Sequence, residues 1–171
     1  AVSGSYSVKD TSTALERMEM AGAFYFTIPG PKMIWMGGEL GYDVSINNPC
    51  RTCNRPFRWN YTGVAERQSV YDIWSALIAL RKAEPVFRTA NFNMQLSSLQ
   101  KTIHLNHSSM NVTVVGNFGV TASNLNPVFQ QTGWWYDYFS GDSIFVNNVT
   151  SPLFLQPGEY HLYTSRKPSV P

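Results

Sequence analysis

The period of the hydrophobic pattern changes near Pro85, and this change limits the fold more than any other feature of the sequence. Before it, apolar residues recur at the spacing of amphipathic helices over residues 10–27 and again over 66–82. After it, short stretches rich in β-branched and aromatic residues alternate with turn formers, which is typical of an antiparallel sandwich or barrel. The sequence therefore predicts a helical part followed by an all-β part.

The expected strands of the all-β part are short. They cover residues 102–105, 111–115, 134–138, 144–146 and 159–163.

A different kind of strand is expected between the two helices. Met33, Ile34 and Trp35 form a short apolar run without alternation, bounded by proline and glycine. Such a run fits a strand covered on both faces, as in a parallel sheet, so we expect a strand over 32–36. Helix, strand, long loop and helix in this order indicate a piece of an alternating α/β architecture. The loop, over 37–63, is long enough to suggest a functional role.

The two cysteines, Cys50 and Cys53, lie within this loop. A zinc site needs four ligands, and the histidines that could complete it are far along the sequence. A thioredoxin-like motif should open a helix, whereas prolines flank this one. We expect either a short-loop disulfide or two free thiols, and no metal.

Composition excludes two classes of partner. The formal net charge is +2, without a basic stripe, so nucleic acid is not expected. No segment approaches the roughly 20 consecutive apolar residues of a membrane helix, so a membrane is not expected either. With 171 residues, of which 43% are hydrophobic, the chain can bury a sizeable core.

Several stretches resemble the α-amylase family of glycoside hydrolases. Those of the first half are similar to the eighth strand and closing helix of that family's (β/α)₈ barrel: TIPGPKMIWMGGELGY (27–42), RPFRWN (55–60) and LIALRKAEPVF (77–87). Those of the second half are similar to the closing strands of its C-terminal domain: WYDYFSGD (135–142) and PLFLQPGEYHLY (152–163).

The resemblance implies an α+β chain. Residues 1–85 would be a helix-strand-helix remnant of a TIM barrel, residues 86–166 an antiparallel Greek-key β-sandwich, and residues 167–171 a tail. The amino-acid sequence of the long loop is most similar to that of bacterial secreted α-amylases, which implies a secreted, periplasmic or cell-surface location.

The same resemblance implies a parent enzyme that acts on α-1,4-glucans such as starch, glycogen and maltooligosaccharides with retention of configuration. Retaining enzymes of this kind use two carboxylates about 5 Å apart. In the family these acids follow the fourth, fifth and seventh strands, which would lie upstream of residue 10. We therefore expect no catalytic residue in this chain, and no cofactor, since the family's calcium sites are also expected upstream. Hydrolysis, transglycosylation and branching by the parent remain open.

Glu39, Arg58 and Trp59 are candidate substrate-binding residues of the long loop. The resemblance puts Glu39 at the C-terminal end of the strand, where we expect it to orient loops rather than react. Glu39 and Asp43 could form a catalytic pair, but a glycine-flanked loop would not fix their separation. For Arg58 and Trp59, a sugar-facing role competes with packing against the barrel rim, which is favoured.

Trp134 and Trp135 support a second hypothesis, a starch- or maltooligosaccharide-binding module, because flat aromatic faces stack on glucose rings. Strand alternation puts Trp134 on one face, and Trp135 with Asp137 on the other. Since one face must fill the core, core or interdomain packing is favoured over a sugar-binding surface.

The strand over 32–36 would be an orphan in this chain, with unpaired backbone groups and apolar side chains. It should pair with another copy, join the edge of the sandwich, or stay poorly ordered. The partners expected are thus the upstream catalytic barrel, an α-glucan bound through the parent enzyme, and a second copy of the chain through 32–36.

Overall fold

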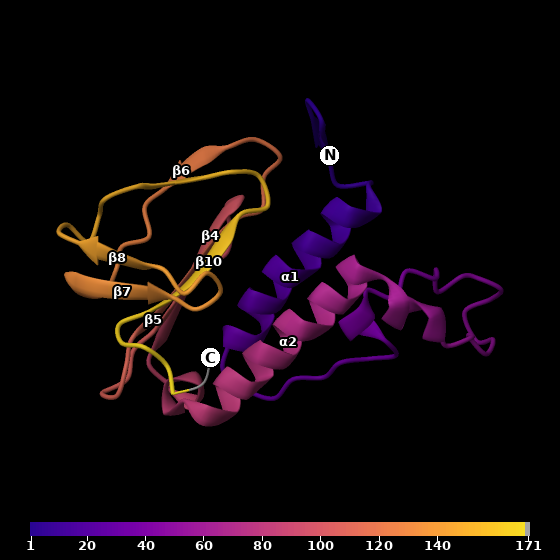
Figure 1. Cartoon of the computed structure of the whole chain (residues 1–171), viewed down its shortest axis with the longest axis horizontal. Coiled ribbons are helices and arrows are strands. Elements are labelled where there is room, and N and C mark those ends of the chain that lie inside the picture. Colours follow the sequence, from indigo (N-terminus) through magenta and orange to yellow (C-terminus); the bar gives the residue numbers. More distant parts are fainter. Residues whose placement is uncertain (170–171) are drawn as a thin grey trace.

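The computed structural model describes residues 1–169 and contains two long helices and an antiparallel sheet (Figure 1). The N-terminal half comprises β1 (Val2–Ser3), β2 (Tyr6–Ser7), α1 (Thr11–Thr27), η1 (Gly38–Leu40), η2 (Trp59–Gly63), α2 (Ala65–Ala83) and η3 (Pro85–Arg88). The C-terminal half comprises β3 (Phe92–Gln95), β4 (Gln100–Leu105), β5 (Val112–Asn117), β6 (Ser123–Leu125), β7 (Gly133–Asp137), β8 (Ser143–Val146), β9 (Leu153–Leu155) and β10 (Tyr160–Thr164).

Helices α1 and α2 lie side by side and run in the same direction. Ser69 Oγ, in the second turn of α2, donates to Oε1 of Glu19 in the middle of α1 at 2.5 Å, and near the ends of both helices Arg81 Nη1 donates to the carbonyl of Phe26 at 2.8 Å. Between these points the Trp74 indole packs directly on Gly22, where an added Cβ would come within 2.3 Å of Nε1. Both helices match the ranges predicted from the hydrophobic period.

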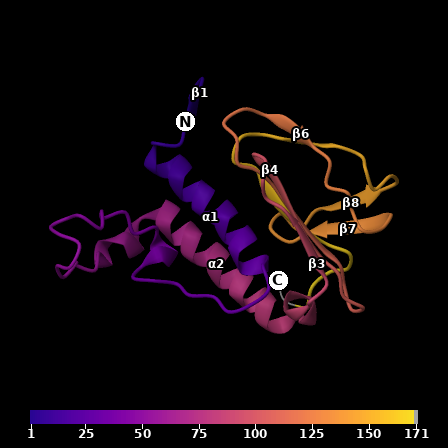
Figure 2. The ribbon, with the colours of Figure 1, turned by 180° about the vertical axis from the view of Figure 1, so that it is seen from behind.

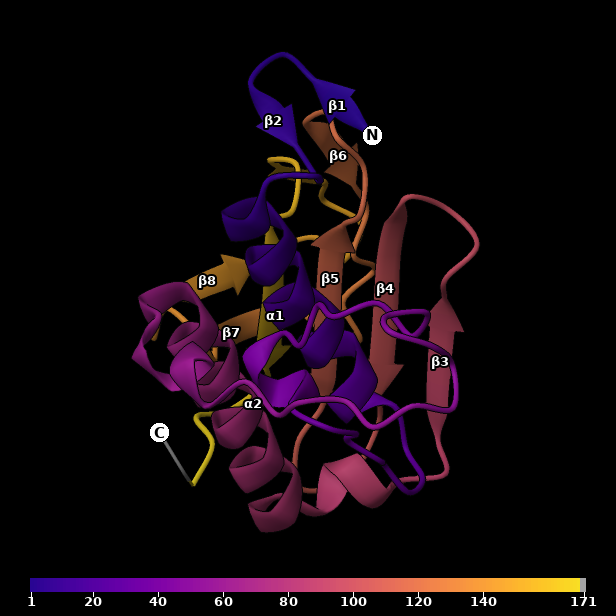
Figure 3. The same ribbon diagram turned by 90° about the vertical axis from the view of Figure 1, so that its right-hand side faces the viewer.

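The strand expected over 32–36 is not formed, which corrects the sequence-based expectation. Residues 31–35 have no regular structure, and a turn follows at Met36. A parallel strand needs neighbours to complete its backbone hydrogen bonds, and residues 1–169 supply none beside this segment. The segment runs along the side of the helix pair that faces away from the sheet (Figure 3).

Every strand pair in residues 1–169 is antiparallel. Six strands form one sheet in the order β3-β4-β5-β10-β7-β8, while β6 pairs with β9 and β1 pairs with β2 in two separate two-stranded sheets. The five predicted strands correspond to β4, β5, β7, β8 and β10. Strands β3, β6 and β9, of three or four residues each, were not predicted, and neither were the two-residue strands β1 and β2.

The main sheet lies between the helix pair and the segment that carries β6 (Figures 1 and 2), and a separate hydrophobic core packs on each of its faces. On β5, Val114 points into the core against the helices, and its neighbour Val115 points into the core against β6 and β9. The core between helices and sheet contains Met20, Ala23, Phe24, Phe26, Leu77, Leu80, Val86, Phe87, Ile103, Leu105, Met110, Val112, Val114 and Leu162. The other core contains Val115, Leu125, Phe129, Trp135, Val146, Leu155 and Tyr163.

Cys50 and Cys53 form a disulfide, which decides between the two alternatives left open by the sequence. It closes a small ring within the long loop. Within residues 1–169, no helix combines the length and apolar character needed to cross a membrane. Of the expected tail, 167–171, residues 170 and 171 lie outside the described residues.

Candidate functional site

Glu39 lies in the short helix η1, immediately after a sharp reversal of the backbone. Met36 and Gly37 both have left-handed backbone conformations, with φ of 46° and 77°. This conformation is uncommon for methionine and strains the backbone. Glu39 is half-buried and borders a groove of about 370 Å³ that Tyr71 and Trp74 of α2 also line. Its carboxylate has no hydrogen-bond partner within residues 1–169, so it is available to a ligand or to a neighbouring chain segment.

Arg67 of α2 anchors the loop that follows Glu39. Its buried guanidinium donates to the carbonyl of Leu40 at 2.9 Å and to that of Gly41, and forms an ion pair with Asp43 at 2.8 Å. Tyr61 Oη donates to the other carboxylate oxygen of Asp43 at 2.5 Å, and the Tyr61 ring lies 3.7 Å from the guanidinium carbon. These contacts hold two distant parts of the loop against one helix.

The surroundings of Asp43 keep it ionised. The hydrogen bond from Tyr61 is the largest influence and, together with Arg67, lowers the pKa of Asp43 despite some burial. A general acid needs the opposite shift, a raised pKa that keeps the carboxyl protonated near neutral pH. Asp43 therefore suits the role of a loop anchor and does not suit that of an acid paired with Glu39.

Sequence reasoning did not identify Arg67 or Tyr61. A signal for Arg67 was present, because it falls on the apolar face of α2, at helical spacing from Val70 and Leu77. A charged residue on a buried face needs partners, which here are the loop carbonyls and a carboxylate.

Arg58 and Trp59 lie at the surface of the same loop. The Trp59 side chain is 74% exposed and its ring contacts that of Phe57, with centroids 4.5 Å apart. Phe57 in turn packs on Gly37, two positions from Glu39. The loop thus brings its aromatic pair to the same turn as Glu39, with Trp59 pointing outward.

The two tryptophans of β7 have opposite environments, as strand alternation predicts. Trp135 is fully buried and packs against Phe129, and its indole donates to the carbonyl of Gln131 at 3.1 Å. That indole is part of the core and has no face left for a ligand. Trp134 is half exposed and meets Phe145 of β8 edge-to-face, with ring centroids 5.2 Å apart.

These two predicted groups do not form one site. The long loop lies beyond the helices at one end of the molecule, whereas β7 and β8 lie at the other end (Figure 1). In addition, no cluster of three or more His, Cys, Asp or Glu side chains within the described part of the chain could hold a metal ion.

The arrangement of helices and sheet is similar to that of solved α-amylase family structures. AmyP, in a complex with maltotriose, superposes with a TM-score of 0.75 at 15% identity, covering 95% of this chain and 37% of AmyP. The α-amylase GTA of Geobacillus thermoleovorans, complexed with acarbose, gives 0.69 at 13% identity, covering 93% of this chain and 34% of GTA. A cyclomaltodextrinase superposes with a TM-score of 0.70 at 21% identity, covering 88% of this chain and 26% of the cyclomaltodextrinase.

The chain thus spans about a third of the length of AmyP and of GTA. At these identities the likeness is one of fold. No protein-family model and no curated protein matches the sequence.

Proposed function

We propose that the chain is the C-terminal part of an α-amylase-type glycoside hydrolase acting on α-1,4-glucans such as starch, glycogen and maltooligosaccharides. Residues 1–85 would supply the last helix, strand and helix of the barrel, residues 86–166 the C-terminal Greek-key β-sandwich, and residues 167–171 its tail. The fold likeness over 88–95% of the chain supports this assignment. So does the order of motifs along the sequence. The enzyme would be secreted, periplasmic or held at the cell surface.

One structural observation carries the proposal: the apolar segment that connects the helices is uncovered. Met33 and Trp35 are 78% and 62% exposed, although the sequence pattern around them is that of a buried strand. In a (β/α)₈ barrel the strands lie inside a ring of helices. The segment lies on the side of the helix pair away from the sheet, which is the side where the rest of a barrel would stand (Figure 3).

The helices already provide the outer wall for such a strand. Met18 and Ala21 of α1 and Trp74 of α2, with the segment itself, line an apolar groove of about 360 Å³. Tyr25 fixes the segment, because its hydroxyl donates to the Met33 carbonyl and accepts from the Met33 amide, each at 2.8 Å. Seven further strands would cover the exposed side chains and pair the free backbone groups.

Within this enzyme the chain would stabilise the barrel and complete it with its last strand and helices. It would contribute no catalytic residue of its own. The ionised Asp43, held by Arg67 and Tyr61, supports this role. Glu39, at the end of the segment, would face the rim of the barrel and orient neighbouring loops.

The test is to express the reading frame with the coding sequence upstream of Ala1 and to measure reducing-sugar release from soluble starch. We expect activity from the longer protein and none from the 171-residue chain. Glu39→Gln in the longer protein should lower activity far less than the 10²- to 10⁴-fold typical of losing a general acid or base. Sugar release by the 171-residue chain that Glu39→Gln abolishes would overturn the proposal.

A second candidate is a module that binds starch or maltooligosaccharides through surface aromatics, and the exposed Trp134 favours it. Its side chain is 53% exposed, and Phe145 packs beside it at a steep interplanar angle of 76°. Titration with maltoheptaose, followed by tryptophan fluorescence, should show saturable quenching that Trp134→Ala removes. A Trp59→Ala variant controls for the exposed indole of the long loop.

A further inference from the structure

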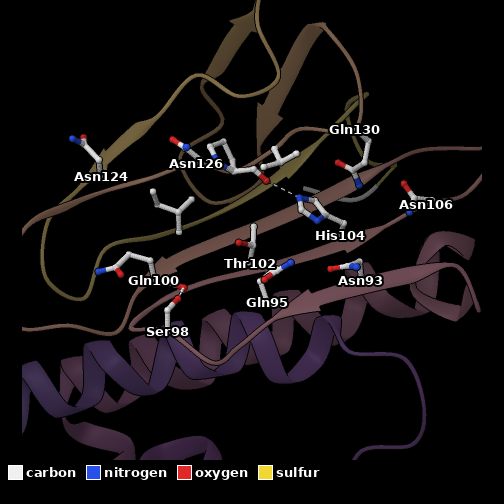
Figure 4. A pocket seen from close by; sticks show the side chains of 13 residues that line it. Asn93, Gln95, Ser98, Gln100, Thr102, His104, Asn106, Asn124, Asn126 and Gln130 are labelled. Atoms are coloured by element: carbon white, nitrogen blue, oxygen red, sulfur yellow. Dashed lines mark hydrogen bonds between the residues drawn. The ribbon is translucent and has the colours of Figure 1, made fainter.

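A polar groove of about 640 Å³ lies on the face of the main sheet that is opposite the helices. Its floor is formed by β3 and β4, and its wall by residues 124–130, which include the end of β6 (Figure 4). The pairing register puts Asn93 beside His104 and Gln95 beside Thr102, so these side chains emerge together on one face.

The wall of the groove is held firmly against its floor. His104 Nε2 is 2.7 Å from the carbonyl of Pro127. Gln130 donates to the carbonyls of Leu105 and Val112, at 3.1 and 2.9 Å, and accepts from Thr113. A groove with fixed walls needs little ordering when a ligand binds.

The lining of the groove carries no charged residue. It offers instead a set of unpaired amides: the lining amide side chains without a hydrogen-bond partner in residues 1–169 are Asn93, Gln95, Gln100, Asn124 and Asn126. Each such carboxamide has two donor hydrogens and an acceptor oxygen. The lining can therefore satisfy groups that both donate and accept, while offering no countercharge to an ion.

His104 adds an acceptor to this set. A carbonyl can only accept, so the proton of the contact with Pro127 is on Nε2. Burial lowers the pKa of His104 and keeps the ring neutral, so Nδ1 is an unprotonated acceptor.

Val128, on the rim of the groove, is a β-branched residue in the left-handed region, with φ of 51°. This conformation is an outlier for valine and is strained. The side chain is nevertheless 51% exposed, so burial in the core does not account for the strain. Next to the amides it provides an apolar surface of the kind that the C–H face of a sugar ring contacts.

We propose that this groove binds an uncharged oligosaccharide, through the amides of Asn93 and Gln95 on its floor and Asn126 on its wall. Vicinal hydroxyl groups donate and accept at neighbouring positions, as the amide pairs do. The volume lies within the usual range of ligand sites. Binding here does not depend on the proposed enzymatic role, because every lining residue belongs to this chain.

The experiment is calorimetric titration of the 171-residue chain with maltoheptaose, cellohexaose and an oligogalacturonate, at millimolar concentrations. We expect binding of at least one neutral oligosaccharide and none of the charged one. The two neutral probes distinguish an α-linked from a β-linked ligand. No binding of either, or equally tight binding of the oligogalacturonate, would overturn the proposal.

Variants locate the binding. Asn93→Ala with Gln95→Ala should weaken it about tenfold or more, since each lost hydrogen bond is worth roughly fivefold. Both side chains are exposed, so the variant should fold normally. Asn147→Ala, an exposed asparagine of a turn outside the groove, should change nothing.

Val128→Gly should weaken binding without lowering the unfolding temperature, because glycine relieves the strain. Trp134→Ala should leave binding in this groove unchanged, because Trp134 does not line it, which separates the groove from the aromatic pair of β7 and β8. If Trp134→Ala removes binding and the Asn93–Gln95 double variant does not, the groove is not the site. Starch hydrolysis by the longer protein is a separate readout, so this proposal and the enzymatic one can fail independently.

Discussion

Glu84 at the end of α2 accepts a hydrogen bond at 2.8 Å from Arg166, which follows β10, across 82 positions of sequence. The other oxygen of Glu84 accepts from the amide and the hydroxyl of Ser169, at 2.8 and 2.9 Å. Only 1% of the Glu84 surface is exposed. Arg166 also donates to the carbonyl of Ser109 at 2.9 Å, so one buried carboxylate connects a helix, the last strand and a loop of the sheet.

Glu84→Gln should lower the free energy of unfolding by about 1–3 kcal/mol, because the buried network loses its charge-assisted hydrogen bonds. Urea unfolding at neutral pH measures the change. Glu16→Gln, on an exposed face of α1, is the control and should stay within about 0.5 kcal/mol. Equal midpoints for the two variants would contradict the role assigned to Glu84.

The carboxylate of Glu84 should also make the free energy of unfolding depend on pH in the acidic range. Burial alone would raise the pKa of Glu84, but the hydrogen bonds from Ser169 and Arg166 outweigh it, so the pKa is lowered. A lowered pKa stabilises the fold above the ordinary value of glutamate, and this contribution disappears as the pH falls through the folded-state pKa. The urea midpoint of the wild type should therefore fall more steeply in acid than that of Glu84→Gln.

His161 should give the opposite dependence. Burial lowers its pKa, but the carboxylates of Asp137, at 2.7 Å, and Glu159, at 3.0 Å, outweigh this, and the pKa is raised. The stabilising contribution is thus complete below the unfolded-state pKa and is lost as the pH rises through the folded-state value. The wild type should therefore lose stability as the pH rises above the ordinary pKa of histidine, and His161→Gln should flatten this slope. An unchanged slope in His161→Gln, with His107→Gln as the reference, would refute the assignment.

The sequence predicted best those elements that are stabilised by contacts within the chain. The helical period located α1 and α2 because their apolar faces pack on each other and on the sheet. Alternation in β7 predicted opposite environments for Trp134 and Trp135 because one face of a short strand must enter a core. Residues 32–36 carry the pattern of a strand, yet no strand forms, because the required neighbours are not among residues 1–169.

The candidate sites were harder to predict for the same physical reason. The polar alternation Asn93–Gln95 and Thr102–His104 is visible in the sequence and could have indicated a polar sheet face. That this face forms a groove depends on residues 124–130, which the chain brings over β4 only in three dimensions. Likewise, the pairing of Arg67 with Asp43 joins a helix to an irregular loop, and no local pattern fixes such a contact.

Gly22→Ala should destabilise the protein although alanine is the better helix former. The added Cβ would lie 2.3 Å from Trp74 Nε1, and the indole cannot move freely because it donates to the Met18 carbonyl at 3.1 Å. Overpacking of this kind costs about 1–3 kcal/mol, more than the roughly 1 kcal/mol gained in helix propensity. Thermal unfolding should show the loss. Gly63→Ala has open space around it and should be nearly neutral, and equal effects at both positions would contradict the close approach.

The uncovered segment should make the 171-residue chain associate with itself. Met33 and Trp35 expose apolar surface next to backbone groups without strand partners, which is a template for pairing with a second copy. We expect concentration-dependent dimers by light scattering, and mainly monomers after Met33→Ser with Trp35→Ser. Phe154→Ser removes an equally exposed aromatic, 61% accessible, from the distant strand β9, and should leave the dimers intact. Because the rest of a barrel would occupy the same surface, the longer protein should be monomeric at concentrations where the 171-residue chain associates. Association that persists in the double serine variant, or that Phe154→Ser removes instead, would place the contact elsewhere and weaken the case that this surface faces a barrel.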